Sequence, residues 1–250
     1  MNNNRNVDIF KGKKIIIFDM DGTLIDSVGI WNKVDEILIN SLSKNKITEY
    51  ENISQNRNQI LAQCKTKNIY LEYCKYLGEK FESQINAKEI LDLRSKISDE
   101  YFKNQVDYKC NADVLLKLLK QNGYILALAT TTTNKQLDIY KKLNQNIIKK
   151  ANIDEFFDLV LCAEDVKFKK PNPEVYNKIL QILKVDASVC LIIEDSLIGV
   201  QAGVNANIDV AVMYDEYSNC DREEINRLSK YQFNNFDEIL TKINSKKKFL

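Results

Sequence analysis

The sequence has 250 residues, which is enough for one large domain or for a core with a smaller companion. Its 36 basic and 35 acidic side chains nearly balance, so we expect no general attraction to nucleic acid or to an anionic membrane. Histidine is absent, which excludes Ser–His and Cys–His nucleophile pairs. Six cysteines without a CxxC pair, and the lack of an apolar run long enough to cross a bilayer, favour reduced thiols and a cytoplasmic location.

The first predicted element is a buried strand over 15–18, a continuous apolar run that ends abruptly at Asp19 and Asp21. Side chains two apart on a strand point to the same side, so both carboxylates emerge together at the carboxyl end of this strand. Open α/β sheets bind their ligands at that end. Two carboxylates this close are costly unless a cation or a shared proton relieves their repulsion. The pair therefore indicates a site that holds a cation or a proton.

The stretch from 28 to 106 has helical periodicity and no convincing strand. Its first helix is expected to begin near Ser27, which can cap it. Further helices are predicted over 60–64, 70–77 and 87–102. We interpret this stretch as a helical insertion and not as part of the sheet.

From about residue 111 helices and strands alternate along the chain. The predicted strands cover 124–130, 157–162, 189–194 and 208–213. Before the first of these strands and between successive ones, the pattern predicts helices over 114–120, 134–144, 173–183 and 197–206. This alternation implies parallel strand pairing with right-handed crossovers.

The predicted fold class is therefore α/β, a Rossmann-like parallel sheet flanked by helices, with a second, smaller all-helical domain inserted after the first strand. We expect the α/β core to comprise 1–27 and 107–250, and the inserted domain to comprise 28–106.

Four polar segments adjoin the predicted strands and helices. They are Asp19-Met20-Asp21-Gly22-Thr23, Thr130-Thr131-Thr132, Lys169-Lys170-Pro171 and Glu194-Asp195-Ser196. Each has an ordinary structural explanation when taken alone. Acidic residues after a strand form turns or cap helices, as Asp195 could, and β-branched threonines suit strands. The order of the four segments is more informative than any one of them.

That order resembles the four motifs of the haloacid dehalogenase superfamily. The matching segments read FDMDGTLIDS, LALATTT, KKPNPEVY and IIEDSLIGVQAG. The chain looks most like the phosphatase and β-phosphoglucomutase subgroup, in which a helical cap is inserted between the first and second motifs. The resemblance spans roughly 13–213 and is weakest in the cap. It implies an enzyme that hydrolyses phosphoric monoesters.

The resemblance also implies a role for each residue of the first motif. Asp19 would attack phosphorus and form an aspartyl-phosphate. Asp21 would protonate the leaving oxygen and then activate water, a division of tasks that two carboxylates can sustain in different environments. Gly22 would permit the sharp exit from the strand, and Thr23 would donate a hydrogen bond to phosphate.

The second and third motifs would bind the phosphoryl group. The resemblance assigns this role to the hydroxyl of Thr130 and the backbone N–H of Thr131. Lys170 would add a compact positive charge beside the phosphate and Asp19.

The fourth motif would complete a metal site. The implied cofactor is Mg²⁺, held by Asp195, Asp19 and the backbone carbonyl of Asp21, since magnesium prefers oxygen ligands and keeps several waters. Glu194 would orient a water on the metal.

Three positions depart from the family pattern. Lys169 and the pair Cys110-Asn111 stand where glycine or Pro-Gly is usual, and Asn207 replaces a glycine after the fourth motif. Asn tolerates a left-handed backbone better than most residues. None of these changes removes a catalytic group.

The sequence is compatible with several functions. The first is a Mg²⁺-dependent phosphatase acting on a small phosphorylated metabolite such as a sugar phosphate, phosphoglycolate or a nucleotide. The second is a β-phosphoglucomutase-like mutase, and a third is phosphonate hydrolysis through a Schiff-base lysine, for which Lys33 is the candidate. A catalytically idle interaction module is the alternative of a different class. We expect a monomer or a weak homodimer.

Overall fold

The computed structural model describes residues 8–43, 53–63, 68–229 and 231–244. The chain divides into two compact units. The core unit comprises Met1–Asp26 and Val106–Leu250, and the helical unit comprises Ser27–Gln105. Cys64, with which one predicted helix ends, lies outside the described residues. None of the helices in the described ranges has the length and apolar character needed to cross a membrane.

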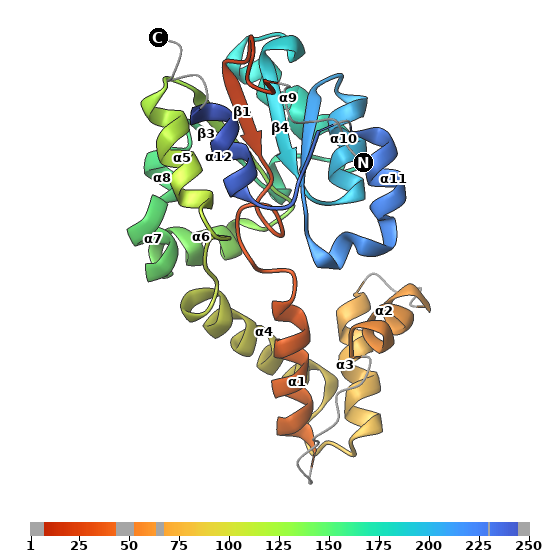
Figure 1. Ribbon diagram of the computed structural model, residues 1–250. Coiled ribbons are helices and arrows are strands. Elements are labelled where there is room, and N and C mark those ends of the chain that lie inside the picture. Colours follow the sequence, from red (N-terminus) through yellow and green to blue (C-terminus); the bar gives the residue numbers. More distant parts are fainter. Residues whose placement is uncertain (1–7, 44–52, 64–67, 230, 245–250) are drawn as a thin grey trace. The chain divides into compact units, whose positions relative to one another are not determined.

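The core unit is built on a six-stranded, all-parallel sheet (Figure 1). Its strand order is β3-β2-β1-β4-β5-β6. The strands are β1 (Ile15–Phe18), β2 (Ile125–Ala129), β3 (Leu159–Leu161), β4 (Cys190–Glu194), β5 (Asp209–Met213) and β6 (Tyr231–Phe233). This arrangement confirms the predicted Rossmann-like α/β fold.

The strand order reverses between β1 and β4. From β1 the chain proceeds through β2 to β3 on one side, and β4, β5 and β6 then extend the sheet on the other side. The backbone registers place Phe18 beside both Leu128 and Ile193, so the three central strands end at the same level. The crevice outside such a reversal is where open α/β sheets bind ligands.

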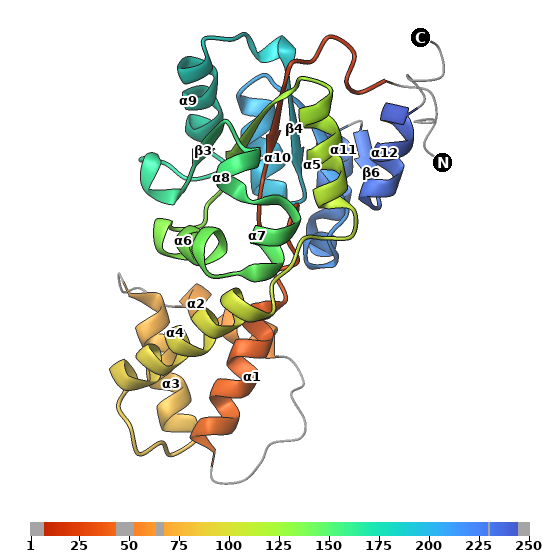
Figure 2. The same ribbon diagram turned by 90° about the vertical axis from the view of Figure 1, so that its left-hand side faces the viewer.

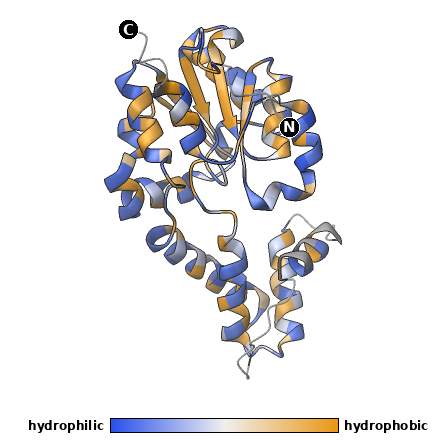
Figure 3. Ribbon diagram, viewed as in Figure 1, coloured by the Kyte–Doolittle hydropathy of each residue, from blue (hydrophilic) through white to orange (hydrophobic). Residues whose placement is uncertain are grey.

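Helices cover both faces of this sheet (Figures 1 and 2). One face is filled by alternate strand residues such as Ile15, Ile17 and Ile192, which pack against Tyr176 of α9 (Glu174–Leu183) and Val200 of α10 (Leu197–Asn205). The strands form the most continuously hydrophobic part of the core unit (Figure 3). Both faces of β1 are buried, which explains why its sequence is an unbroken apolar run and does not alternate.

The remaining helices of the core unit are shorter on average. They are α5 (Ala112–Gln121), α6 (Asn134–Lys142), α7 (Gln145–Ala151), α8 (Ile153–Phe156), α11 (Arg222–Leu228) and α12 (Phe236–Asn244). Three 3₁₀ helices accompany them, η2 (Ala163–Asp165), η3 (Ala187–Val189) and η4 (Glu216–Asp221). The sequence did not predict β6, α7, α8, α11 or α12. The first four have seven residues or fewer and are too short to show a clear hydrophobic period, whereas α12, with 9 residues, is as long as α6 and α10 and was overlooked.

Backbone conformation at two asparagines agrees with the sequence. Asn207, which stands where the family usually has glycine, adopts a φ of 56°, as its tolerance of the left-handed region predicts. Asn111, at another departure from the family pattern, has a φ of 64° and precedes α5 directly. Both substitutions are therefore compatible with the local turns.

The helical unit contains α1 (Ile30–Leu42), α2 (Ile53–Gln63), α3 (Ile69–Lys80) and α4 (Ala87–Asn104). Its core is a cluster of apolar side chains from α1, α3 and α4 that includes Leu38, Tyr73 and Ile90. The predicted cap of α1 by Ser27 is wrong, because the helix begins after Gly29. No strand interrupts the described part of this unit, in agreement with its sequence pattern.

A buried charge cluster joins three helices of this unit. Asp35 of α1 is fully buried, and its carboxylate is 2.7 Å from Arg57 of α2 and 2.7 Å from Arg94 of α4. The Arg94 guanidinium lies 4.6 Å from the centre of the Trp31 ring. Because one carboxylate compensates two guanidinium groups, its removal would leave both cations without this partner.

We expect Asp35→Ala to destabilise the helical unit by about 3–5 kcal/mol, the usual cost of breaking a buried ion pair. Trp31 is the single tryptophan of the chain and lies in this unit, so urea unfolding followed by its fluorescence measures the effect. Glu36→Ala is the matched control, since its pair with Lys33 is on the surface and contributes under ~1 kcal/mol. Equal unfolding midpoints for the two variants would contradict a stabilising role for the cluster.

Candidate active site

The chain turns sharply as it leaves β1. Asp19 donates its backbone N–H to the carbonyl of Ile193 (3.0 Å), which continues the pairing with β4 for one residue. The carbonyl of Met20 then accepts from the N–H groups of Leu24 and Ile25 at 2.9 and 3.0 Å. Gly22 has a φ of 86°, a conformation in which a residue with a side chain is strained. The first motif is thus a tight loop that presents Asp19 and Asp21 at the sheet edge.

Lys170 lies at the centre of the site. Its Nζ is 2.6 Å from Oδ1 of Asp19, 2.8 Å from Oε1 of Glu194 and 2.9 Å from the carbonyl of Ala129. These contacts use all three donors of the ammonium group. The side chain is almost fully buried, unlike that of a lysine in a solvated loop.

Both carboxylate oxygens of Glu194 are fixed by hydrogen bonds. Its Oε2 accepts hydrogen bonds from the backbone N–H groups of Asp195 (2.7 Å) and Ser196 (2.8 Å), while Oε1 binds Lys170. A Cβ added to Gly199 would lie only 1.6 Å from Oε1, so this position of α10 has no room for a side chain. Glu194 therefore positions Lys170, and its predicted role toward a metal-bound water stays a prediction.

Asp195 is buried and is not the cap of α10. Ser196 caps that helix, since its hydroxyl accepts from the N–H of Gly199 at 3.2 Å. The Asp195 carboxylate instead accepts from the hydroxyl of Thr23 at 2.6 Å. In this structure the single donor of Thr23 is thus directed at Asp195, and its predicted contact with phosphate stays a prediction.

The threonines after β2 differ in their surroundings. Thr130 is buried, and its hydroxyl accepts from the N–H of Thr132 at 3.0 Å. Thr131 is exposed. Thr132, for which no role was predicted, is buried and donates its hydroxyl to Oδ2 of Asp21. It therefore holds the second carboxylate of the first motif.

Three further residues support Asp195 and were not found from the sequence. Ser218 of η4 lies 3.4 Å from Oδ2 of Asp195. The buried carboxylate of Asp215 caps η4 by accepting from the N–H of Tyr217 (2.9 Å). Lys109 binds Asp215 at 2.7 Å and donates its backbone N–H to the carbonyl of Leu24 at 2.8 Å. These contacts link the loop after β1 to the segment beside Asp195, over more than 100 residues of sequence.

Lys33, the candidate for a Schiff base, lies on α1 of the helical unit. Its side chain is exposed, and its Nζ is 2.9 Å from Glu36. A lysine that forms a Schiff base is usually activated in a desolvated pocket, and this exposed side chain has no such surroundings.

Burial dominates the electrostatics of the site. It raises the pKa of Asp19 to about 7, an effect that Lys170 opposes and that Glu194 and Asp21 reinforce. Burial, with Glu194 and Asp19 next, also holds the pKa of Asp195 well above its usual value. For Lys170 burial favours the neutral form, but Asp19 and Glu194 outweigh it and raise the pKa of the ammonium group. The site thus holds more carboxylates than its one buried ammonium compensates.

A divalent cation fits this donor set. Carboxylate oxygens of Asp19, Glu194 and Asp195 all lie within 4.8 Å of one another. Hard oxygen donors of this kind suit Mg²⁺, and a cation among them would favour their ionised forms. The Asp21 carboxylate is not part of this cluster of the described residues; its predicted contribution is its backbone carbonyl.

Comparison with known proteins agrees with this geometry. Residues 16–213 match the family described as haloacid dehalogenase-like hydrolase. Among curated proteins, the pyrophosphatase PpaX of Bacillus thuringiensis is 26% identical over 198 residues, which cover 79% of this chain and 82% of that protein.

Two solved structures show the same fold. The magnesium-bound hydrolase YfnB of Bacillus subtilis has a TM-score of 0.69 at 18% identity and covers 93% of this chain and 99% of its own. A protein assigned as a β-phosphoglucomutase from Thermotoga maritima has a TM-score of 0.68 at 20% identity, with the same coverage of both chains.

Replacing Lys109 should destabilise the core unit. We expect Lys109→Met to cost about 3–5 kcal/mol of unfolding free energy, because it leaves the buried Asp215 carboxylate without its cation. Urea unfolding followed by circular dichroism measures this loss. Lys117→Met removes a lysine from a surface pair with Asp113 and should change stability by under ~1 kcal/mol. A loss no larger than that of Lys117→Met would show that the Lys109–Asp215 pair does not hold the segment.

Proposed function

The chain belongs to the haloacid dehalogenase-like hydrolase family, and from this membership and the site we propose that it is a Mg²⁺-dependent phosphatase acting on a small phosphorylated metabolite. The observation that carries the proposal is the buried contact of Lys170 with Asp19, beside Asp195, at the reversal of strand order. The pyrophosphatase relative supports a phosphorylated substrate.

In this proposal the phosphoryl group binds next to Asp19. Lys170 neutralises part of its charge, and the hydroxyl of Thr130 with the backbone N–H of Thr131 supplies hydrogen bonds. Gly22 allows the backbone of the first motif to approach the phosphate closely. The exposed position of Thr131 and the buried position of Thr130 are compatible with a phosphate bound at the outer edge of the sheet.

The first half of the reaction transfers the phosphoryl group to the protein. A carboxylate oxygen of Asp19 forms a bond to phosphorus as the bond from phosphorus to the leaving oxygen breaks. Asp21 gives a proton to that oxygen, and the alcohol departs. Thr132 fixes the orientation of Asp21 during this transfer.

The second half regenerates the enzyme. Asp21, now ionised, accepts a proton from a water molecule whose oxygen attacks phosphorus. The bond between phosphorus and Asp19 breaks, phosphate leaves, and the Asp19 carboxylate is restored. One residue thus acts first as an acid and then as a base.

Asp19, Asp195 and the backbone carbonyl of Asp21 would hold Mg²⁺, with Glu194 near the bound ion. When bound, the ion would offset negative charge on the phosphoryl group and on these carboxylates. Thr23 keeps the Asp195 carboxylate oriented toward this position.

The wider assignment follows from the same proposal. We propose that 1–27 and 107–250 form the catalytic core domain and 28–106 an inserted cap domain, in a cytoplasmic protein that is a monomer or a weak homodimer. A β-phosphoglucomutase-like mutase is the second candidate, favoured by the fold neighbour from Thermotoga maritima. It would use the same aspartyl-phosphate but transfer the group to a sugar hydroxyl.

We expect the purified protein with Mg²⁺ to release phosphate from at least one member of a panel of sugar phosphates, phosphoglycolate and nucleotides. Asp19→Asn should reduce turnover by at least ~10³-fold, because an amide is a poor nucleophile. Asp209→Asn, which alters a carboxylate paired with Lys13, is the control and should retain activity. Formation of glucose 6-phosphate from β-glucose 1-phosphate would favour the mutase, and inactivity without Mg²⁺ binding would favour an interaction module.

Two variants should show that turnover can be lost with or without a loss of Mg²⁺ binding. Asp21→Ala should lose turnover by roughly 10²–10⁴-fold, the contribution of a general acid, yet bind Mg²⁺ through its unchanged backbone carbonyl. Asp195→Ala should lose Mg²⁺ affinity as well. Isothermal titration calorimetry with Mg²⁺ measures the affinity of each variant. Equal losses of affinity would show that the Asp21 carboxylate is itself a ligand.

A further inference from the structure

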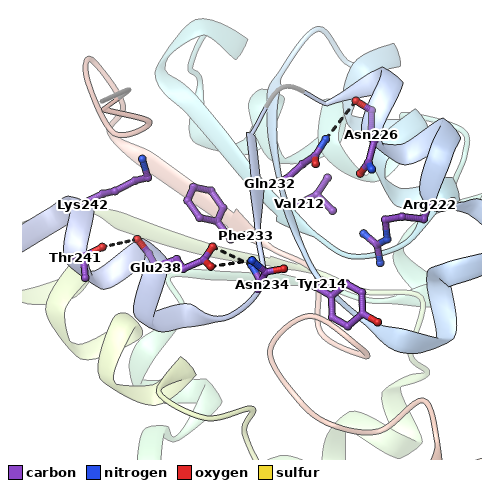
Figure 4. Close-up of a pocket in the computed structure, with 10 residues that line it drawn as sticks. All are labelled: Val212, Tyr214, Arg222, Asn226, Gln232, Phe233, Asn234, Glu238, Thr241 and Lys242. Carbon is purple, nitrogen blue, oxygen red and sulfur yellow. Dashed lines mark hydrogen bonds between the residues drawn. The ribbon is translucent and has the colours of Figure 1, made fainter. Parts of the chain in front are cut away.

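A cavity lies in the core unit, apart from the residues proposed for catalysis. It has a volume of about 600 Å³ and lies around the ends of β5 and β6, next to α11 and α12 (Figure 4). Its lining residues are Val212, Tyr214, Arg222, Asn226, Gln232, Phe233, Asn234, Glu238, Thr241 and Lys242. This volume is in the range of cavities that bind small molecules.

The charges along this cavity favour an anion. Arg222 and Lys242 line it, against a single carboxylate from Glu238. Both oxygens of that carboxylate accept from Asn234, one from the backbone N–H at 3.0 Å and one from the side-chain amide at 2.8 Å. Glu238 is therefore engaged within its own turn, and the lining has a formal charge of +1.

Arg222 is pre-oriented and has an unused donor. Its Nη2 donates to the carbonyl of Asp215 at 2.9 Å, and its guanidinium lies 4.9 Å from the centre of the Tyr214 ring. The buried Nε–H, by contrast, meets no acceptor in the part of the chain that the structure describes. Buried donors are almost always paired in folded proteins, so this one calls for an explanation.

A ligand oxygen that reached this Nε–H from the cavity would supply the missing acceptor. The Nε–H and an adjacent Nη–H of a guanidinium form a planar fork that matches the two oxygens of a carboxylate or phosphate. Asp215 and Tyr214 already hold the Arg222 side chain in place, so less of its conformational entropy is lost when a ligand binds. The rest of a small molecule would meet both aromatic and polar side chains of the lining. These are the rings of Tyr214 and Phe233 and the amides of Asn226 and Asn234 (Figure 4).

We propose that this cavity is a binding site for a small metabolite that carries a carboxylate or phosphate group, and that Arg222 is its anchor. The site is separate from the catalytic carboxylates and does not depend on the proposed phosphatase activity. Its lining comes from β5, β6, α11, α12 and the loops that follow the two strands.

The side-chain Nε–H resonance of Arg222 in a ¹⁵N-labelled full chain tests the site directly. The resonance is assigned by its loss in Arg222→Lys, and the two probes are inorganic phosphate and benzoate at concentrations up to ~10 mM, in the range of weak metabolite binding. We expect a saturable shift. A shift with phosphate indicates a phosphoryl ligand, and one with benzoate a carboxylate ligand, whereas sodium chloride at equal ionic strength should give none.

Two variants of α11 test whether the probe binds in this cavity. Asn226→Glu adds a carboxylate to an exposed lining position and should weaken the binding of the active probe by at least ~10-fold. Arg227→Gln removes an arginine from the same helix without touching the cavity, and should leave binding unchanged. The proposal is overturned if neither probe shifts the resonance, or if Asn226→Glu binds the probe as well as Arg227→Gln does.

Discussion

The ammonium group of Lys170 offsets the repulsion among the carboxylates that lie at the carboxyl ends of the strands. Lys170 contacts Asp19, Glu194 and the carbonyl of Ala129 within 2.9 Å and is shielded from water. These acceptors lie at the ends of β1, β4 and β2, which are the three central strands of the sheet. A single cation therefore ties together the strand ends on both sides of the reversal, and removing one partner of such a buried pair usually costs about 3–5 kcal/mol.

This arrangement also constrains residues that touch no substrate. Glu194 can face Lys170 because α10 has Gly199 where a side chain would collide with the carboxylate. Ser196 caps α10 and leaves Asp195 available to Thr23 and Ser218. The start of α10, Gly199 and the ion pair between Glu194 and Lys170 thus depend on one another. The residues of the fourth motif are therefore needed for packing as well as for chemistry.

The sequence predicted the parts of the site that lie at strand ends. Asp19 and Glu194 follow short, unbroken apolar runs, whose burial fixes where each strand stops. Contacts between distant segments outside the four motifs were not predictable, because no local pattern reports them. Lys109 and Asp215 are ordinary polar loop residues until the fold brings them within 2.7 Å. The edge strand β6, with three residues, is likewise defined by its pairing with β5 and not by a hydrophobic period.

The surroundings of Asp19 and Asp21 differ although only one residue separates them. Asp19 is buried and paired with an ammonium group, which fixes one of its oxygens. Asp21 is half-buried at the outer side of the loop and accepts a hydroxyl from Thr132. The tight loop that Gly22 permits places one carboxylate beside the buried cation and leaves the other half-buried, a separation that suits the proposed roles of nucleophile and acid–base residue.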